Sequence, residues 1–441
     1  MRTANDQEGE ISKKIEDRTA LVAVIGLGYV GLPFAIEAAK AGFKVVGIDE
    51  STQKVALVNS GTSYIADVPS SVLAEFTSNG MIRASSDFAE VSLTDVVVIA
   101  VPTPLTSNLT PELRHVEAVT RSIAKFMTPG TLVSLESTTY PGTTEEVMLP
   151  ILEASGLKAG VDFFLAHSPE RVDPGNPNFN TKNTNKVVGG VDVRSHRVAE
   201  AFYSKIIDKV VPVSSAKAAE LVKVFENTFR AVNIALVNEI TILCDKMNLN
   251  AWEVLDAAFT KPFGIMPFYP GPGVGGHCIP LDPHYLEWKA KEFNFKTHFI
   301  SLAGEVNRRM PSFVKEKAAR ILNHQGLAVS RSTILMLGVS YKRNVGDHRE
   351  SPAVEVMREF KQDGANLIYH DKYVPLVNEH GLNLEGQPLD EKLLQAADLV
   401  VICTEHSCVD YDYVVQHSKA ILDTRNATKK VVRNRERITL L

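Results

Sequence analysis

The chain has 441 residues, of which 44% are hydrophobic and 22% are charged, and its formal net charge is -5. This length corresponds to roughly two to four domains at about 150 residues each, and the composition excludes a disordered chain. The slightly acidic balance argues against nucleic acid as a partner, because a protein that coats a phosphate backbone needs a basic face.

Residues 1–19 predict a polar N-terminal extension, since they lack the apolar centre of a secretory signal. No apolar run in the chain reaches the roughly 18 residues that a membrane-spanning helix needs. The four cysteines form no CxxC pair and no cluster with histidines, which indicates a reducing compartment and no structural metal. We therefore expect a cytoplasmic protein that does not bind membranes, with Cys244, Cys403 and Cys408 as packing residues.

The first strong pattern is a dinucleotide-binding fingerprint in residues 20–50, where an apolar run ends at three glycines and passes into a helical segment. Gly26 permits the tight turn, Gly28 lets the backbone approach a pyrophosphate, and Gly31 allows close packing of helix on strand. The next strand ends at Asp49, where a carboxylate can accept the ribose hydroxyls of NAD and repel the additional phosphate of NADP. The alternative is a glycine turn in an unrelated α/β unit.

Further apolar runs with loop-forming ends first continue this α/β region and then, from residue 332 onward, predict a second one. The runs span 95–104, 130–144, 332–347, 366–371, 397–406 and 419–426. The later set has no glycine fingerprint, since Gly338 stands alone, and the cations Lys342 and Arg343 suit a different phosphate-bearing ligand. We predict an α/β protein with two Rossmann-like doubly wound domains, joined by a long central helix and a helical middle domain. The expected segments are 20–213 for NAD, 214–325 for the middle and 326–441 for a nucleotide-sugar.

Residues 214–248 contain neither glycine nor proline and predict one long helix, which Ser214 or Ser215 can cap. Lys223 and Asn227 are four positions apart, so both side chains lie on one face of this helix. The alternative is that both side chains are simply solvated.

A glycine-rich stretch at 271–283 contains Cys278 and closes with Asp282 and Pro283. Glycines allow close approach and unusual backbone angles, so the pattern indicates a thiol that is presented and not packed. A tight loop that carries a small apolar residue by chance is the alternative.

Seven segments, taken together, resemble the nucleotide-sugar 6-dehydrogenases over roughly residues 20–430. They are "GLGYVGLP" (26–33), "VPTP" (101–104), "STTYPGTT" (137–144), "SPERVDPG" (168–175), "ELVKVFENTFRAVNIALVNE" (220–239), "GPGVGGHCIPLDP" (271–283) and "GVSYKRNVGDHRESPA" (338–353). This family oxidises a UDP-hexose at C6 to the uronic acid with two NAD, for surface polysaccharide precursors. The stretch from Lys261 is most similar to enzymes of UDP-N-acetylglucosamine, with UDP-N-acetylmannosamine and UDP-glucose as alternatives. The resemblance also implies a homodimer through the long helix.

The resemblance implies that Cys278 forms a thiohemiacetal with the C6 aldehyde and then a thioester, which water releases. Lys223 and Asn227 would stabilise the developing oxyanion on the C6 oxygen.

Three further residues complete the implied catalytic set. Glu170 would orient the hydrolytic water, Thr138 would lie beside it, and Asp282 would be the remaining polar group. Asp282 can also cap the helix that follows it. We exclude Asp173 and His277 from the set.

The implied binding residues form two groups. The cofactor group is Gly26, Gly28, Tyr29, Val30, Gly31, Asp49, Pro102, Thr103, Thr138 and Arg349. The substrate group is Glu170, Arg171, Lys223, Asn227, Tyr269, Gly273, Gly275 and Lys342.

Two other classes of protein share the dinucleotide-binding fingerprint. A one-step dehydrogenase of small hydroxy acids would need neither Cys278 nor a second α/β domain, and a non-catalytic NAD-binding module would need only the fingerprint.

Overall fold

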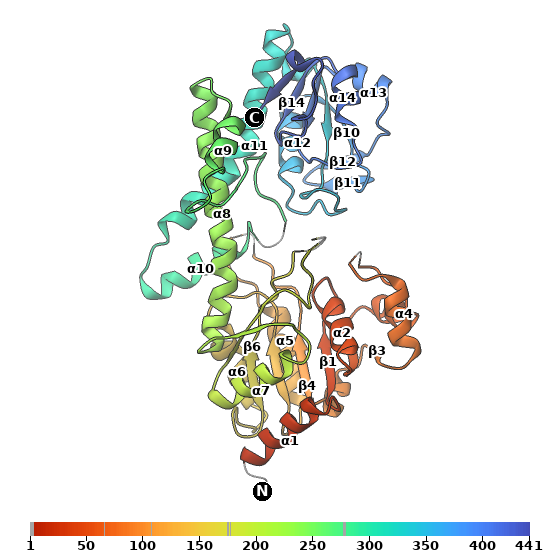
Figure 1. Ribbon diagram of the computed structural model, residues 1–441, viewed down its shortest axis with the longest axis vertical. Coiled ribbons are helices and arrows are strands. Elements are labelled where there is room, and N and C mark those ends of the chain that lie inside the picture. Colours follow the sequence, from red (N-terminus) through yellow and green to blue (C-terminus); the bar gives the residue numbers. More distant parts are fainter. Residues whose placement is uncertain (1–3, 66, 107, 174–175, 177, 277–278) are drawn as a thin grey trace. The chain divides into compact units, whose positions relative to one another are not determined.

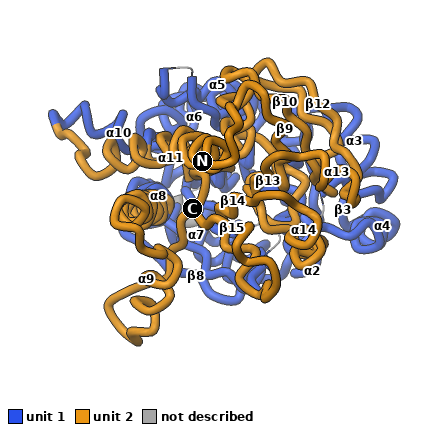
Figure 2. Tube along the Cα trace, turned by 90° about the horizontal axis from the view of Figure 1, so that it is seen from above, with its two compact units in different colours: residues 1–226, 284–294 blue, residues 227–283, 295–441 orange. Residues whose placement is uncertain are grey.

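The computed structural model describes residues 4–65, 67–106, 108–173, 176, 178–276 and 279–441. His277 and Cys278 therefore lie outside the described residues. The chain forms two compact units, coloured separately in Figure 2. Unit 1 comprises Met1–Glu226 and His284–Asn294, and unit 2 comprises Asn227–Pro283 and Phe295–Leu441. The division falls inside the long helix at residues 216–246.

Unit 1 is built on an eight-stranded sheet in the order β3-β2-β1-β4-β5-β6-β7-β8 (Figure 1). The strands are β1 (Leu21–Ile25), β2 (Lys44–Ile48), β3 (Ile82–Ser85), β4 (Val96–Ile99), β5 (Leu132–Leu135), β6 (Phe164–His167), β7 (Lys186–Gly190) and β8 (Val210–Pro212). Neighbouring strands are parallel except for β6 and β7, which are antiparallel. Because β1 lies between β2 and β4, the sheet winds in both directions from β1.

Helices cover both faces of this sheet because successive strand residues point to opposite sides. Val22 and Val24 pack with α2 and α7, whereas Ala23 and Ile25 pack with α5 and α6. The helical segments of unit 1 are α1 (Ala4–Glu16), α2 (Gly31–Lys40), α3 (Thr52–Asn59), α4 (Ser70–Ser78), η1 (Phe88–Leu93), α5 (Arg114–Phe126), η2 (Thr144–Met148), α6 (Leu149–Glu153), α7 (Val193–Tyr203) and η3 (Lys291–Phe293).

The N-terminal extension, expected from its polar composition, contains the helix α1. Ile11 and Ile15 are buried, so the helix has an apolar face that the overall polarity concealed. Lys14 Nζ lies 2.7 Å from Asp95 Oδ1 and ties the helix to the residue before β4.

Unit 2 contains a five-stranded parallel sheet in the order β10-β9-β13-β14-β15 and a separate hairpin of β11 and β12. Its strands are β9 (Thr333–Leu337), β10 (Asn366–His370), β11 (Leu376–Glu379), β12 (Leu382–Glu385), β13 (Leu399–Ile402), β14 (Ile421–Asp423) and β15 (Ile438–Leu440). Helices α11 (His298–His324) and α12 (Pro352–Gln362) cover one face, and α13 (Glu391–Ala396) and α14 (Tyr411–His417) cover the other. The remaining helical segments are α9 (Ala251–Ala258), η4 (Val329–Arg331) and η5 (Arg435–Arg437). The predicted pair of doubly wound sheets is confirmed.

Two helices contain residues of both units. The predicted long helix is α8, Ala216–Lys246, and Ser215 Oγ accepts a hydrogen bond from the Ala218 amide at 3.1 Å, so Ser215 is the cap. The other is α10, Asp282–Ala290. Among the described residues, no helix is both long enough and apolar enough to cross a bilayer.

The cysteine predictions were correct at two positions and wrong at one. Cys244 and Cys403 are buried, as packing residues should be. Cys408 is exposed, because it lies in the turn between β13 and α14 and not within the strand.

Candidate active site

The turn between β1 and α2 has the geometry that a dinucleotide requires. Gly26 has φ of +92°, and a Cβ there would lie 2.4 Å from the Ala100 carbonyl oxygen. A Cβ at Gly31 would lie 1.9 Å from the Gly26 oxygen, so helix and turn touch. A Cβ at Gly28, by contrast, would meet nothing within 4 Å, and Val30 caps α2 without a side-chain hydrogen bond. The open position and the helix N-terminus fit a pyrophosphate.

Asp49 follows β2 and is buried against this turn. Its carboxylate accepts hydrogen bonds from the amides of Leu27 at 2.8 Å and Ser51 at 2.9 Å. Lys54 Nζ lies 3.2 Å from Asp49 Oδ2. The first turn of α3 therefore brings a lysine back onto the carboxylate at this strand end.

The loops after β4 and β5 bring together two residues predicted to contact the cofactor. Thr103 Oγ1 donates a hydrogen bond to the Thr138 carbonyl oxygen at 2.6 Å. Ser137 Oγ accepts from the Val101 amide at 2.9 Å, one residue before Pro102. Tyr29, on the glycine turn, is 57% exposed and leaves its ring available to a ligand.

Glu170 lies in the loop after β6 with its carboxylate held on both oxygens. Oε1 accepts hydrogen bonds from the amides of Arg171 at 2.7 Å and Val172 at 2.6 Å. Oε2 lies 3.7 Å from Lys186 Nζ. Arg171 itself forms a two-point ion pair with Glu226 of α8, with nitrogen to oxygen distances of 2.5 and 3.2 Å. That pair ties the Glu170 loop to the long helix.

The polar residues predicted on the long helix are buried. Lys223 is 7% exposed and Asn227 is 0% exposed, which excludes the alternative that both are simply solvated. Asn227 Nδ2 donates to Asp282 Oδ2 at the start of α10, and Arg230 donates to Asn227 Oδ1. The second hydrogen on Nδ2 can serve a ligand, because an amide nitrogen carries two donors.

The predicted catalytic residues are divided between the units. Thr138, Glu170 and Lys223 belong to unit 1, whereas Asn227 and Asp282 belong to unit 2. The structure brings Asn227 and Asp282 together, and the sequence predicted both.

The glycine-rich loop packs closely on a second loop of unit 2. A Cβ at Gly275 would lie 2.7 Å from Pro352 Cδ and 2.8 Å from Tyr341 Cβ. Gly273 has φ of +136°, which side-chain-bearing residues rarely adopt. These glycines are required for contact between backbone segments, and the contact brings Gly273 and Gly275 close to the loop that carries Lys342.

Two predicted binding residues already have partners within unit 2. Arg349 forms hydrogen bonds of 2.9 and 2.6 Å with the carboxylate of Asp347. Tyr269 donates to Asp256 Oδ1 at 2.8 Å, and its ring stacks on Trp252 at 5.6 Å. A ligand that binds to either side chain would therefore have to share it with this partner or displace the partner.

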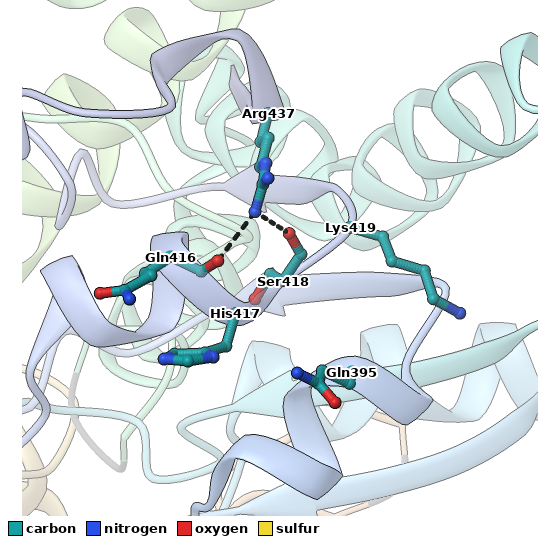
Figure 3. A pocket seen from close by; sticks show the side chains of 6 residues that line it. All are labelled: Gln395, Gln416, His417, Ser418, Lys419 and Arg437. Atoms are coloured by element: carbon teal, nitrogen blue, oxygen red, sulfur yellow. Dashed lines mark hydrogen bonds between the residues drawn. The ribbon is translucent and has the colours of Figure 1, made fainter.

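A hollow in unit 2 lies away from the predicted residues (Figure 3). It is lined by Gln395, Gln416, His417, Ser418, Lys419 and Arg437. These residues precede the amino ends of β13, β14 and β15, whereas ligands of such sheets bind at the carboxyl ends. Arg437 donates hydrogen bonds to the carbonyl oxygens of Gln416 and Ser418. We therefore do not assign a functional site to this hollow.

Sequence reasoning missed four charged residues around the predicted set: Arg230, Glu220, Lys186 and Glu136. Glu220 accepts hydrogen bonds from the amide and hydroxyl of Thr144, at 2.8 and 2.6 Å, and fastens the 137–144 loop to α8. Burial raises the pKa of Glu220 to about 7. A charged residue beside the apolar runs at 132–135 and 187–188 was the available signal for Glu136 and Lys186.

The fold and the glycine turn define a class, the NAD-dependent dehydrogenases that carry a second α/β domain. Three family domains match the chain in order. They are the NAD-binding domain at 20–207, the central domain at 217–309 and the UDP-binding domain at 335–430. The chain belongs to the UDP-glucose/GDP-mannose dehydrogenase family, and it is an NAD-dependent nucleotide-sugar 6-dehydrogenase.

Similar proteins include enzymes of two epimeric sugars. The UDP-N-acetyl-D-mannosamine dehydrogenase of Pyrococcus horikoshii is 35% identical over 416 residues, covering 93% of this chain and 96% of that protein. The UDP-N-acetyl-D-glucosamine 6-dehydrogenase of Pseudomonas aeruginosa is 34% identical, covering 88% and 90%. The solved structure of the Pyrococcus horikoshii enzyme superposes with a TM-score of 0.84 at 34% identity, covering 92% and 96%. These matches confirm the predicted family.

Proposed function

We propose that this enzyme oxidises the C6 hydroxyl of a UDP-N-acetylhexosamine to the uronic acid, for surface polysaccharide precursors, with UDP-N-acetylglucosamine preferred. The observation that carries the proposal is the buried pair of Asn227, on α8, with Asp282 at the start of α10, where the glycine-rich segment ends. The names of similar proteins support a 2-acetamido sugar of either C2 configuration. UDP-N-acetylmannosamine is thus the second candidate substrate.

Four electrons must leave C6 without release of the aldehyde, and this requirement explains the thiol. Bound NAD supplies the chemistry of accepting a hydride, once for each of the two oxidations. The Cys278 thiolate adds to the aldehyde carbon, and Lys223 and Asn227 stabilise the oxyanion that forms. Buried donors of this kind are each worth about 3 kcal/mol. Lys223 and Asn227 are both buried, at 7% and 0% exposure.

Hydrolysis of the thioester releases the acid. Glu170 receives a proton from the attacking water, the new C6–O bond forms, and the C6–S bond breaks with its electron pair on sulfur. Thr138 lies in the neighbouring loop, and Asp282 holds Asn227 in the orientation that presents its amide hydrogen.

The remaining predicted residues would bind the two nucleotides. The glycine turn, Asp49, Pro102 and Thr103 would hold NAD, since Gly28 leaves open space at the helix N-terminus. Lys342 and Arg349 would meet phosphate oxygens, in exchange for the intramolecular pair of Arg349 with Asp347.

The substrate assignment is tested by the rate of NADH formation with four donors: UDP-N-acetylglucosamine, UDP-N-acetylmannosamine, UDP-glucose and UDP-galactose. We expect the two acetamido sugars to give the higher kcat/KM, with UDP-N-acetylglucosamine first. A kcat/KM for UDP-glucose at or above both would contradict the proposed substrate class.

The covalent mechanism is tested with Cys278→Ser, because serine is a weaker nucleophile of similar size. We expect uronic acid formation to fall by a factor of about a thousand or more, by analogy with the loss of an activated nucleophile. The matched control is Cys408→Ser, which removes an exposed thiol. Mass spectrometry of Glu170→Gln with substrate and NAD should show a sugar adduct on Cys278. Wild-type turnover by Cys278→Ser would refute the mechanism.

We also propose a homodimer formed through α8. An apolar stripe of exposed side chains runs along this helix, namely Leu221 (42%), Phe225 (61%), Phe229 (41%), Leu236 (56%) and Leu243 (49%). Sedimentation of Phe225→Glu against wild type tests the interface, and an unchanged mass would contradict it.

A cytoplasmic location is part of the proposal, because the free thiols of Cys244, Cys403 and Cys408 suit a reducing compartment.

A further inference from the structure

A buried ion pair lies behind Glu170 in unit 1. Lys186 begins β7, which runs antiparallel to β6, and Glu136 directly follows β5. Lys186 Nζ lies 3.0 Å from Glu136 Oε2 and 3.7 Å from Glu170 Oε2. The side chains of Lys186 and Glu136 are 4% and 0% exposed, whereas that of Glu170 is 15% exposed. One ammonium therefore joins a sealed carboxylate to a carboxylate that solvent reaches.

The far side of this pair is closed by aromatic side chains. Tyr203 OH donates a hydrogen bond to Glu136 Oε1 at 2.9 Å. Lys186 Nζ lies 5.5 Å from the ring centre of Tyr203 and 5.8 Å from that of Phe34. Burial raises the pKa of Glu136 above its ordinary value, against the attraction of Lys186. The lysine is thus fixed in place by two carboxylates and two rings.

The other charged groups near Glu170 are directed elsewhere or are neutral. Burial, with Lys186 nearby, lowers the pKa of His167 on β6 to about 3, so this ring is neutral near pH 7. Arg171 directs its guanidinium to Glu226 of α8. Asp173 follows in the same loop. Among the described residues, Lys186 is the cation whose ion pair with Glu170 is established by distance.

We propose that Lys186, supported from behind by Glu136, is a positioning residue that orients the carboxylate of Glu170 for thioester hydrolysis. The inference rests on the proposed function of Glu170. In that step the carboxylate takes one proton from water as the C6–O bond forms and the C6–S bond breaks. The second proton of the new acid is lost to solvent. An opposite charge close to a carboxylate favours its ionised form.

This geometry makes two substitutions act in opposite directions. Lys186→Met removes the cation, so the acid limb of the hydrolysis rate should move up by about one pH unit. Glu136→Gln removes the anion that competes for Lys186, so Lys186 interacts with Glu170 alone. The acid limb of the hydrolysis rate should therefore move to lower pH. A merely structural role would disturb both variants without this reversal of sign.

The measurement is a rapid-quench experiment over a series of pH values. Intact-protein mass spectrometry follows the decay of the acylated enzyme, while absorbance follows NADH from the oxidation steps. We expect Lys186→Met to slow decay about tenfold on the acid limb, in proportion to the lost carboxylate fraction, with NADH of the first turnover little changed. The control is Lys182→Met, an exposed lysine four positions earlier.

Folding is checked by thermal unfolding of every variant. The double variant Lys186→Met with Glu136→Gln leaves no unpaired buried charge, and it should show the upward shift of the single lysine variant. An acid limb that coincides with wild type in the lysine variants, or shifts of equal sign in both single variants, would overturn the inference. Absence of NADH from wild type with every UDP-sugar would instead refute the proposed function itself.

Discussion

The two sheets of this chain carry the same turn in two versions. In unit 1 the turn follows β1 and begins at Gly26, and in unit 2 it follows β9 and begins at Gly338, with φ of +92° and +79°. In each unit a carboxylate follows the neighbouring strand, Asp49 after β2 and Asp371 after β10. Asp49 accepts from the Leu27 amide at 2.8 Å, and Asp371 accepts from the Val339 amide at 2.9 Å. The frame of the turn is therefore the same.

The difference lies at the next position of the turn. Gly28 leaves open space in unit 1, whereas unit 2 has Ser340, whose amide also donates to Asp371, at 3.0 Å. His406 Nδ1 accepts from the Asn344 amide at 3.0 Å, so Nε2 of the same ring donates to Asp371 Oδ2 at 3.1 Å. The protein's own groups fill the second turn. One frame thus binds a dinucleotide in unit 1 and holds a loop in unit 2.

The largest expected effect comes from breaking the second turn. Asp371→Ala removes the acceptor for His406 and for the amides of Val339, Ser340, Tyr373 and Val374. We expect unfolding free energy to fall by about 3 kcal/mol or more, since buried donors lose their acceptor. Calorimetric unfolding measures it. Asp49→Ala is the comparison and should lose less, because Asp49 accepts from two amides and a half-exposed lysine. Equal losses would contradict the distinction.

The two units should also respond to pH in opposite directions. Burial raises the pKa of Glu220 to about 7 from 4.5, so the native state holds a proton that the unfolded chain has lost. Its contribution to stability falls as pH rises from about 4.5 to 7, by about 3 kcal/mol in total. Urea unfolding across this range should show the slope in wild type and lose it in Glu220→Gln. Identical slopes would contradict the assignment.

For Asp371 the sign is reversed. Although burial raises its pKa, hydrogen bonds from His406 and from the amides of Val339 and Ser340 outweigh burial and hold the pKa at about 2. This stabilisation is complete above about pH 3.8 and disappears as pH falls toward 2. Amide exchange at Val339 should therefore accelerate on acidification, beyond the change in intrinsic rate.

A smaller effect is expected from filling the open turn. Gly28→Ala places a Cβ where the backbone meets no protein atom within 4 Å, so the fold should persist. NAD binding should weaken about tenfold, or about 1.4 kcal/mol, because the pyrophosphate approaches this backbone. Titration calorimetry measures the Kd. Ser340→Ala is the control in the other turn and should leave NAD binding unchanged. If Gly28→Ala binds NAD as wild type does, the open position does not hold the cofactor.

The smallest effect concerns the lysine beside Asp49. Lys54→Met removes the cation 3.2 Å from Asp49 Oδ2, so the carboxylate should discriminate more strongly against the phosphate of NADP. We expect the ratio of Kd for NADP to Kd for NAD to rise about fivefold, consistent with a partly exposed pair worth about 1 kcal/mol. Lys372→Met, next to Asp371, is the control. A ratio that falls would mean that Lys54 does not neutralise Asp49.

The sequence by itself determined the first sheet's nucleotide turn and most of the second sheet. Apolar runs and loop-forming residues located β1, β2, β4 and β5, and also β9, β10, β13 and β14, because most of these strands are buried on both faces and read as continuous apolar stretches. The short hairpin of β11 and β12 was not predicted, because its half-exposed residues form no continuous apolar stretch. The long helix was predicted because it contains no breaker and Ser215 caps it.

Only the tertiary structure decided which charges meet. Lys54 returns to Asp49 from the first turn of α3, and Lys186 reaches Glu136 and Glu170 across three segments of the sheet edge. Sequence patterns report periodicity along one element, whereas these pairs form between elements whose separation in the chain carries no periodic signal. Burial then sets their consequences, because a charge enclosed by protein keeps its ionised form only where an opposite charge or hydrogen-bonding groups lie within a few ångströms.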